Sequence, residues 1–275
     1  MKIDKLLFGT AGIPFSTLLR STVNGIGQIK QLGLGCMEME FVHSINITKE
    51  KAPEVKAAAE KHGVVLTCHA PYFINLNSLE PAKAHASIGR IVNSAKILSL
   101  CGGWSVCYHP GFFMKSSASE AMERCKKNVK IIMDKLADEG VDVWVRPETT
   151  GKHSAVGNLA ECIELSKSFE KVLPCIDFAH LHARANGGVN SYAEFCSILE
   201  TVEKELGKTA LNNMHIHYSG INYGEKGEKN HLILKESDAK WQDLLKALKK
   251  FKVKGCLICE SPNLEKDALI MSKFY

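Results

Sequence analysis

The chain carries the stretch VLTCH at residues 65–69, a short apolar run that ends on a histidine, and repeats the pattern as VCYH at residues 106–109. Short runs of this kind are typical of β-strands. Further runs also end on or beside a histidine or a carboxylate. In a closed barrel of parallel strands, the carboxyl ends of the strands carry the chemistry, so we expect these side chains to converge there as a metal site. The candidate ligands are His69, His109, Glu148, Asp177, His180, His217, His231 and Glu260.

Apolar runs and helical patterns alternate along the whole chain, which predicts a parallel sheet. Eight repeats favour closure into a single (β/α)8 barrel domain spanning residues 1–275, and no linker-like stretch divides it. The expected strands are residues 6–10, 36–42, 64–69, 104–109, 141–148, 172–178, 213–219 and 255–260. The expected helices are residues 48–62, 80–100, 119–138, 158–168, 191–206, 237–251 and 264–274.

Composition narrows the class of protein. The 275 residues are 45% hydrophobic, enough for one large core, and no apolar run is long enough to span a membrane. The N-terminus lacks a signal-peptide stretch, so we expect a cytoplasmic protein whose ten cysteines are mostly small buried residues and not disulfides. The net charge of +5 is weak support for a polyanionic partner, and no obligate protein partner is evident.

A lone histidine at a strand end is more often a structural hydrogen-bonding residue, but two at equivalent positions of neighbouring strands favour ligation. His215 and His217 share one strand face, and we choose His217 because it is nearer the carboxyl end. His215 is expected one layer deeper, as a hydrogen-bonded core histidine. Glu148 would be costly if buried alone, so it needs cations or, alternatively, Arg146. His182, two residues from His180, is the alternative candidate for the ligand role given to His180.

Several motifs together resemble the endonuclease IV family, whose members are apurinic/apyrimidinic endonucleases built on a TIM barrel. The similarity runs in order over nearly the whole chain, although no single piece is specific. The pieces are TCHAPYFINL around His69, YHPG at His109, PETTG at Glu148, DFAH from Asp177, HIHYSG at His217, NH at His231 and CESP at Glu260.

The resemblance implies two or three zinc ions. His69 and His109 would hold the first, with Glu148 bridging to a second that Asp177, His217 and Glu260 complete; His180 and His231 would hold a third. The implied partner is double-stranded DNA with abasic lesions, and the implied reaction is hydrolysis of the phosphodiester 5′ to the baseless sugar in DNA repair. Glu148 and Glu260 would be the catalytic carboxylates.

Two departures from the family pattern affect these expectations. The family has an aspartate two residues before the last histidine, where this chain has Lys229, so the third metal site depends on whether Glu228 substitutes. The Asn/Arg-rich segment that enters DNA in the family is also missing after the second strand. Tyr72 and Phe73 are then the candidate wedge residues, unless they only pack their loop. Cations at the same end for phosphate binding are Lys115, Lys152, Arg184, Lys226 and Lys229.

Two other classes of function remain open. A sugar isomerase or epimerase of the xylose-isomerase-like superfamily also places a Glu, Asp, His and Glu set around one divalent ion, which Glu148, Asp177, His217 and Glu260 would satisfy. The additional histidines favour the nuclease, because a single-ion isomerase has no need of them. A non-enzymatic metal or nucleic-acid binder is the third interpretation.

Overall fold

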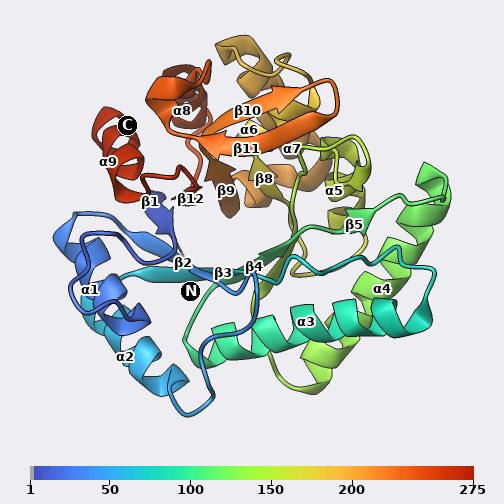
Figure 1. Ribbon diagram of the computed structural model, residues 1–275, viewed down its shortest axis with the longest axis horizontal. Coiled ribbons are helices and arrows are strands. Elements are labelled where there is room, and N and C mark those ends of the chain that lie inside the picture. The colour runs from blue at the N-terminus through green and yellow to red at the C-terminus, as the bar shows by residue number, and fades with distance from the viewer. Residues whose placement is uncertain (1–2) are drawn as a thin grey trace.

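The computed structural model describes residues 3–275 and contains eight parallel strands with helices around them (Figure 1). The sheet order is β6-β4-β3-β2-β1-β12-β9-β8. Parallel bridges from Val145 to Val172 and from Glu148 to Cys175 join the two edges, so the sheet closes and the predicted (β/α)8 barrel is confirmed. The strands are β1 (Leu6–Ala11), β2 (Cys36–Glu40), β3 (Val65–His69), β4 (Ser105–Tyr108), β6 (Trp144–Pro147), β8 (Cys175–Asp177), β9 (Met214–Tyr218) and β12 (Gly255–Cys259).

Seven of the helices were expected from the sequence, with shifted ends. They are α2 (Ala52–His62), α3 (Pro81–Leu100), α4 (Ala118–Asp138), α5 (Leu159–Lys167), α7 (Tyr192–Leu211), α8 (Trp241–Lys250) and α9 (Glu265–Phe274). Two more were missed. The helix α1 (Thr22–Gln31) contains Gly25 and Gly27, which weaken its helical pattern. The short helix α6 (Phe178–Arg184) begins directly after β8, where the sequence suggested the end of a strand followed by a loop.

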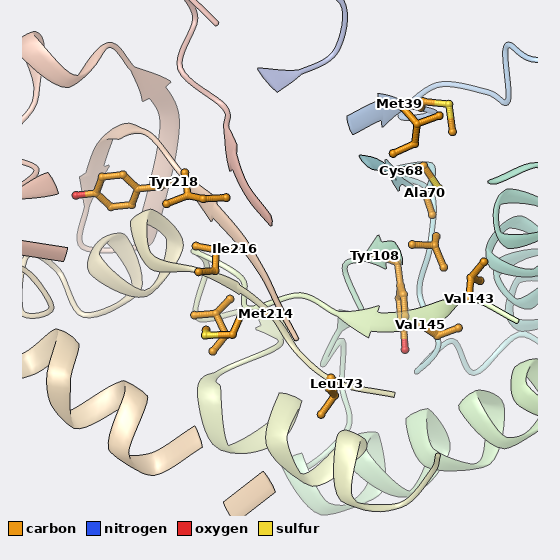
Figure 2. Packing of buried hydrophobic residues seen from close by; sticks show 14 of the residues in the cluster. Met39, Cys68, Ala70, Tyr108, Val143, Val145, Leu173, Met214, Ile216 and Tyr218 are labelled. Carbon is orange, nitrogen blue, oxygen red and sulfur yellow. The ribbon is translucent and has the colours of Figure 1, made fainter. Parts of the chain in front are cut away.

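Strand alternation separates an apolar outer layer from a polar barrel interior. Met214, Ile216 and Tyr218 of β9 belong to the large apolar cluster that the helices cover (Figure 2). The intervening His215 and His217 point to the opposite face, into the barrel. The helix side of this core is built by the usual spacing, as in α4, whose Val129, Ile132 and Leu136 are buried and whose N-terminus is closed by a capping box. The outer layer therefore supports the fold while the interior is free for chemistry.

The loops at the carboxyl ends of the strands contain structure that the sequence did not predict. Residues 220–236, expected to be a loop, form an antiparallel hairpin of β10 (Gly220–Gly224) and β11 (Gly227–Leu232), followed by the 3-10 turn η1 (Leu234–Glu236). A second pair, β5 (Gly111–Phe112) and β7 (Ala155–Val156), ties two neighbouring loops together. All ten cysteines are buried and free, as expected. Within residues 3–275, no helix has the length and apolar character needed to cross a membrane.

Candidate metal centre

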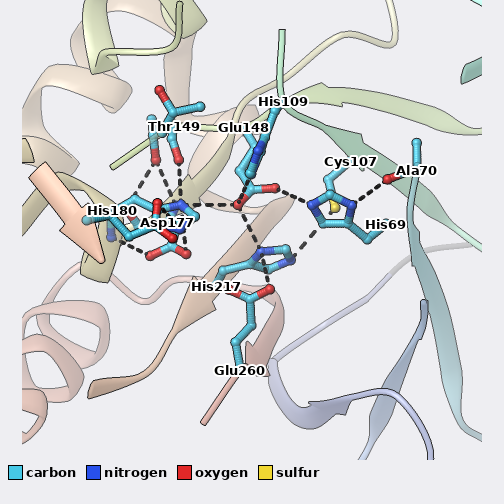
Figure 3. A network of polar contacts seen from close by, with 12 residues as sticks. His69, Ala70, Cys107, His109, Glu148, Thr149, Asp177, His180, His217 and Glu260 are labelled. Carbon is cyan, nitrogen blue, oxygen red and sulfur yellow. Dashed lines mark hydrogen bonds and ion pairs between the residues drawn. The ribbon is translucent and has the colours of Figure 1, made fainter. Parts of the chain in front are cut away.

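The Glu148 carboxylate lies at the middle of a ring of imidazoles (Figure 3). It follows β6 directly and is almost fully buried. Its Oε2 is 3.2 Å from His69 Nε2, and its Oε1 is 3.3 Å from His109 Nε2. Oε1 also lies 3.3 Å from His217 Nδ1 and 3.4 Å from His180 Nδ1. The strand ends of β3, β4 and β9 thus bring histidines that are distant in sequence to one carboxylate.

The remaining predicted ligands surround the same centre. Glu260 Oε1 is 3.4 Å from His217 Nδ1, and Asp177 Oδ2 is 3.1 Å from His180 Nδ1. Asp177 also accepts a hydrogen bond from the backbone N–H of His180, because it is the N-cap of α6. His231 of β11 lies with its Nδ1 4.0 Å from Glu260 Oε2. All eight residues expected as ligands are therefore gathered at one end of the barrel.

These side chains form overlapping groups whose ligand atoms lie within 4.8 Å of one another. Glu148 is common to three of the groups, as a residue between two metal ions would be. The groups at the rim are His69 with Cys107 and Glu148; His109 with Glu148 and His180; Glu148 with Asp177, His217 and Glu260; and Asp177 with His180 and His231.

Unsatisfied polar atoms fit a metal site. Glu148 Oε2, Asp177 Oδ2, Glu260 Oε2 and His109 Nε2 are buried and make no well-oriented hydrogen bond. Buried carboxylate oxygens without partners are costly, and cations compensate that cost. Imidazole nitrogens with carboxylate oxygens are a donor set typical of zinc. The residues present therefore suit divalent metal ions.

Burial and close contact shift the pKa values of the carboxylates and imidazoles of this centre. Burial opposes ionisation of Glu148, but His109 and His217 outweigh it and hold the pKa of Glu148 well below the usual range. Burial also lowers the pKa of His69, yet contact with Glu148 outweighs it and raises that pKa to about 10. Burial raises the pKa of Glu260 well above its ordinary value. Protons on such groups exchange for metal ions on binding.

A β-bulge brings an additional carboxylate to the centre. β10 and β11 pair Tyr223 with Glu228 and Asn222 with Asn230, so Lys229 is an extra residue in β11. Bulges re-aim side chains. Glu228 Oε2 lies 3.5 Å from His180 Nε2, whereas Lys229 is exposed and its side chain lies against Gly224. A carboxylate therefore reaches His180 from position 228, the substitution that the sequence left open.

The edge of the centre carries exposed aromatic side chains. Tyr72 is 54% exposed and its ring lies 5.8 Å from that of His69, while Phe73 is 66% exposed. More than half of each residue is therefore accessible to a bound substrate. Arg184, in contrast, donates to the backbone oxygens of Lys152 and Ala155, so its guanidinium stabilises a loop and is a poor candidate for phosphate binding.

The structure also decides between two pairs of alternatives. His182 contacts Asp238, with 3.1 Å between Nε2 and Oδ1, and lies outside the ligand groups, so His180 is the residue at the centre. Arg146 does not pair with Glu148. Its guanidinium donates instead to Ser105, Asn213 and the Pro174 carbonyl, one layer deeper in the barrel.

Sequence reasoning missed the role of β2. Glu40 is paired in register with His69, and Glu38 contacts both His215 and His217. Burial, with Glu38 nearby, raises the pKa of Glu40 to about 8. The signal was present, because Glu38 and Glu40 are two apart and so share one strand face.

Relatives of the chain include a similar protein without an assigned function and more distant proteins with a nuclease name. An uncharacterized protein from Methanocaldococcus jannaschii is 44% identical over 271 residues, covering 98% of this chain and 97% of the relative. A probable endonuclease 4 from Mycoplasma genitalium is 24% identical over 203 residues, covering 72% of this chain and 67% of the relative.

Solved structures agree on the fold. Endonuclease IV from Thermus thermophilus has a TM-score of 0.73 at 18% identity, covering 98% of both chains. A 3-keto-D-glucoside 4-epimerase from E. coli has a TM-score of 0.72 at 15% identity, also covering 98% of both chains. A family model described as xylose isomerase-like TIM barrel matches residues 26–273. The chain belongs to the xylose isomerase-like TIM barrel family.

Proposed function

We propose that this protein is a zinc-dependent endonuclease that hydrolyses the phosphodiester 5′ to abasic sites in DNA. The observation that carries the proposal is the surplus of ligands around Glu148. Four imidazoles lie within 3.2–3.4 Å of its carboxylate, and Asp177, Glu260 and His231 extend the cluster. A single ion cannot use so many ligands, whereas phosphoryl transfer with several metal ions requires them.

The residues divide into ligands and substrate contacts. When bound, divalent ions lower the pKa of water and neutralise phosphate oxygens. Glu148, which contacts four imidazoles, would contribute to more than one ion site, and Glu260 and Asp177 would supply further negative charge. At the edge, Tyr72 and Phe73 present exposed rings that can stack on bases next to a gap in the duplex. Lys229, exposed on the hairpin, is available to a phosphate.

One observation favours a second candidate, a sugar isomerase or epimerase. Glu148, Asp177, His217 and Glu260 lie within 4.8 Å of one another and form a complete single-ion set. Glu40, a carboxyl group paired in register with His69, stands at the same rim. A single-ion sugar enzyme would leave His69, His109, His180 and His231 without a role as ligands, so we rank it second.

The decisive experiment is a nicking assay on a duplex oligonucleotide with one tetrahydrofuran abasic analogue, combined with metal analysis. We expect more than one zinc ion per chain and nicking 5′ to the analogue that weakens steeply with added salt. Glu148→Gln should abolish nicking, while Glu123→Gln, an exposed change on α4, should not. An intact duplex, together with one ion per chain and epimerisation of a ketose, would overturn the proposal in favour of the second candidate.

A further inference from the structure

Directly beneath the metal centre, the barrel interior holds two buried charged groups. Glu38 of β2 and Arg146 of β6 are both 0% exposed. Across residues 3–275, no carboxylate lies within ion-pair distance of the Arg146 guanidinium. Its planar face is covered by Trp104, 4.8 Å from ring centroid to Cζ. Each of the two groups needs polar partners, because an unpartnered buried charge is costly.

Ser105 and His215 connect the two groups. Arg146 Nε donates to Ser105 Oγ at 2.6 Å, and a guanidinium has no acceptor, so the serine oxygen accepts. The hydroxyl hydrogen of Ser105 is then free for His215 Nδ1, which lies 3.1 Å away. His215 Nδ1 accordingly carries a lone pair and its proton is on Nε2, which is 3.0 Å from Glu38 Oε2. The direction of each hydrogen bond follows from the previous one.

The other oxygen of Glu38 faces a predicted metal ligand. Glu38 Oε1 is 2.9 Å from His217 Nε2. The contacts of Glu38 with His215 and with His217 are both at hydrogen-bond distance, but their N–H···O angles are bent from linear. A carboxylate only accepts, so a proton on His217 Nε2 faces Glu38, and Nδ1, on the side of Glu148 and Glu260, is the nitrogen that would bind a metal ion. Thr67 Oγ1 donates to Glu38 at 2.8 Å and fixes its orientation.

We propose that Glu38 is a positioning residue that presents His217 Nδ1 to the metal centre, and that the chain Arg146–Ser105–His215 holds Glu38 in place from the opposite side of the barrel. Carboxylates that fix the tautomer of a metal-bound histidine commonly raise metal affinity. The inference rests on the metal centre of the proposed function but not on its substrate.

The side chains in the layer of Glu38 and Arg146 could alternatively form a second metal site, but the positive charge of Arg146 disfavours it. Cys107, Cys175, His215 and His217 also bring their ligand atoms within 4.8 Å of one another. A second ion there would lie in the layer that already contains the buried Arg146 guanidinium, and would need the His215 and His217 nitrogens that Glu38 occupies. Cys175→Ala should therefore leave the zinc count unchanged. Loss of one ion per chain would overturn the hydrogen-bond chain in favour of a metal.

Glu38→Gln tests the proposal on the full-length protein, with zinc affinity measured by competition against a chelator. The glutamine keeps the volume, but its amide accepts from only one imidazole and turns N–H groups toward the other. We expect zinc binding to weaken about 10–100-fold. Ser105→Ala should also weaken zinc binding, while Ser94→Ala should leave zinc binding unchanged. Ser94 is the matched control because it is also a fully buried serine, but in α3 and without a hydrogen-bond partner among residues 3–275.

Spectra of the zinc-loaded protein labelled with 15N-histidine keep the proposal testable if Glu38→Gln fails to fold. We expect a proton on Nε2 and none on Nδ1 for both His215 and His217. A proton on Nδ1 of either residue, or zinc affinity in a folded Glu38→Gln variant within twofold of the wild type, overturns it. A wild type that binds zinc without nicking DNA refutes the proposed function and leaves this inference intact.

Discussion

Replacing Glu228 by glutamine should weaken one metal position and leave the others. Glu228 reaches His180 only because Lys229 is an extra residue in β11, and its Oε2 lies 3.5 Å from His180 Nε2. Its side chain is 21% exposed, so it is the most accessible carboxylate of the centre. The variant removes a negative charge from the position shared by His180 and His231 while keeping the side-chain volume.

The size of the effect follows from this distance. Glu228 Oε2 lies 3.5 Å from His180 Nε2, so we take a similar separation between this carboxylate and an ion bound nearby. Two unit charges about 3.5 Å apart attract by about 5 kcal/mol at an effective dielectric constant of about 20. Solvent screens part of this attraction, which leaves about 3 kcal/mol. Since each 1.4 kcal/mol is about a tenfold change in affinity, zinc at this position should bind about 100-fold more weakly.

The assay is zinc content by mass spectrometry after dialysis against buffers of defined free zinc. We expect Glu228→Gln to lose one ion per chain at zinc concentrations that saturate the wild type. Glu225→Gln, an exposed change on the same hairpin, is the control. Adding Lys229→Asp to Glu228→Gln should not restore the ion, because position 229 faces away toward Gly224. Unchanged zinc content in Glu228→Gln, or recovery in the double variant, would refute the role given to the bulge.

Three further predictions concern the same centre. Glu260→Gln should lower nicking at least about 100-fold with an unchanged melting curve; near-normal turnover would contradict its assignment. The pKa of His69 is raised to about 10, so it stabilises the metal-free protein fully below its unfolded value near 6.5 and loses that effect as pH rises toward 10. Denaturant midpoints should therefore fall from pH 7 to pH 10, and a rising midpoint would show that the His69–Glu148 contact does not dominate. Tyr72→Ala should raise the KM for the abasic duplex about tenfold with little change in kcat, as for one lost stacking contact, whereas Leu100→Ala, also exposed, should not.

The sequence predicted what depends on local pattern. Strands and their ends follow from short apolar runs. The order of residues along the strand predicted His217 nearer the rim and His215 one layer deeper, and the structure has both side chains at these levels. The features that the sequence could not predict depend on closure of the barrel and on the pairing of strands. The bulge at Lys229 exists only once β10 and β11 are paired, and the position of Glu38 between two histidines exists only once β2 lies across the barrel from β9.

The barrel interior is arranged in layers of increasing polarity. At the amino end, Cys36, Val65, Trp104 and Cys256 form a small apolar cluster, separate from the large core between strands and helices. Glu38 and Arg146 occupy the next layer, and the ligands form the rim. Because the large outer core supplies most of the hydrophobic stabilisation, the fold tolerates a costly polar interior. Under the proposal above, the buried charges beneath the ligands have a role at the rim, because the chain from Arg146 to His217 fixes which imidazole nitrogen faces the metal centre.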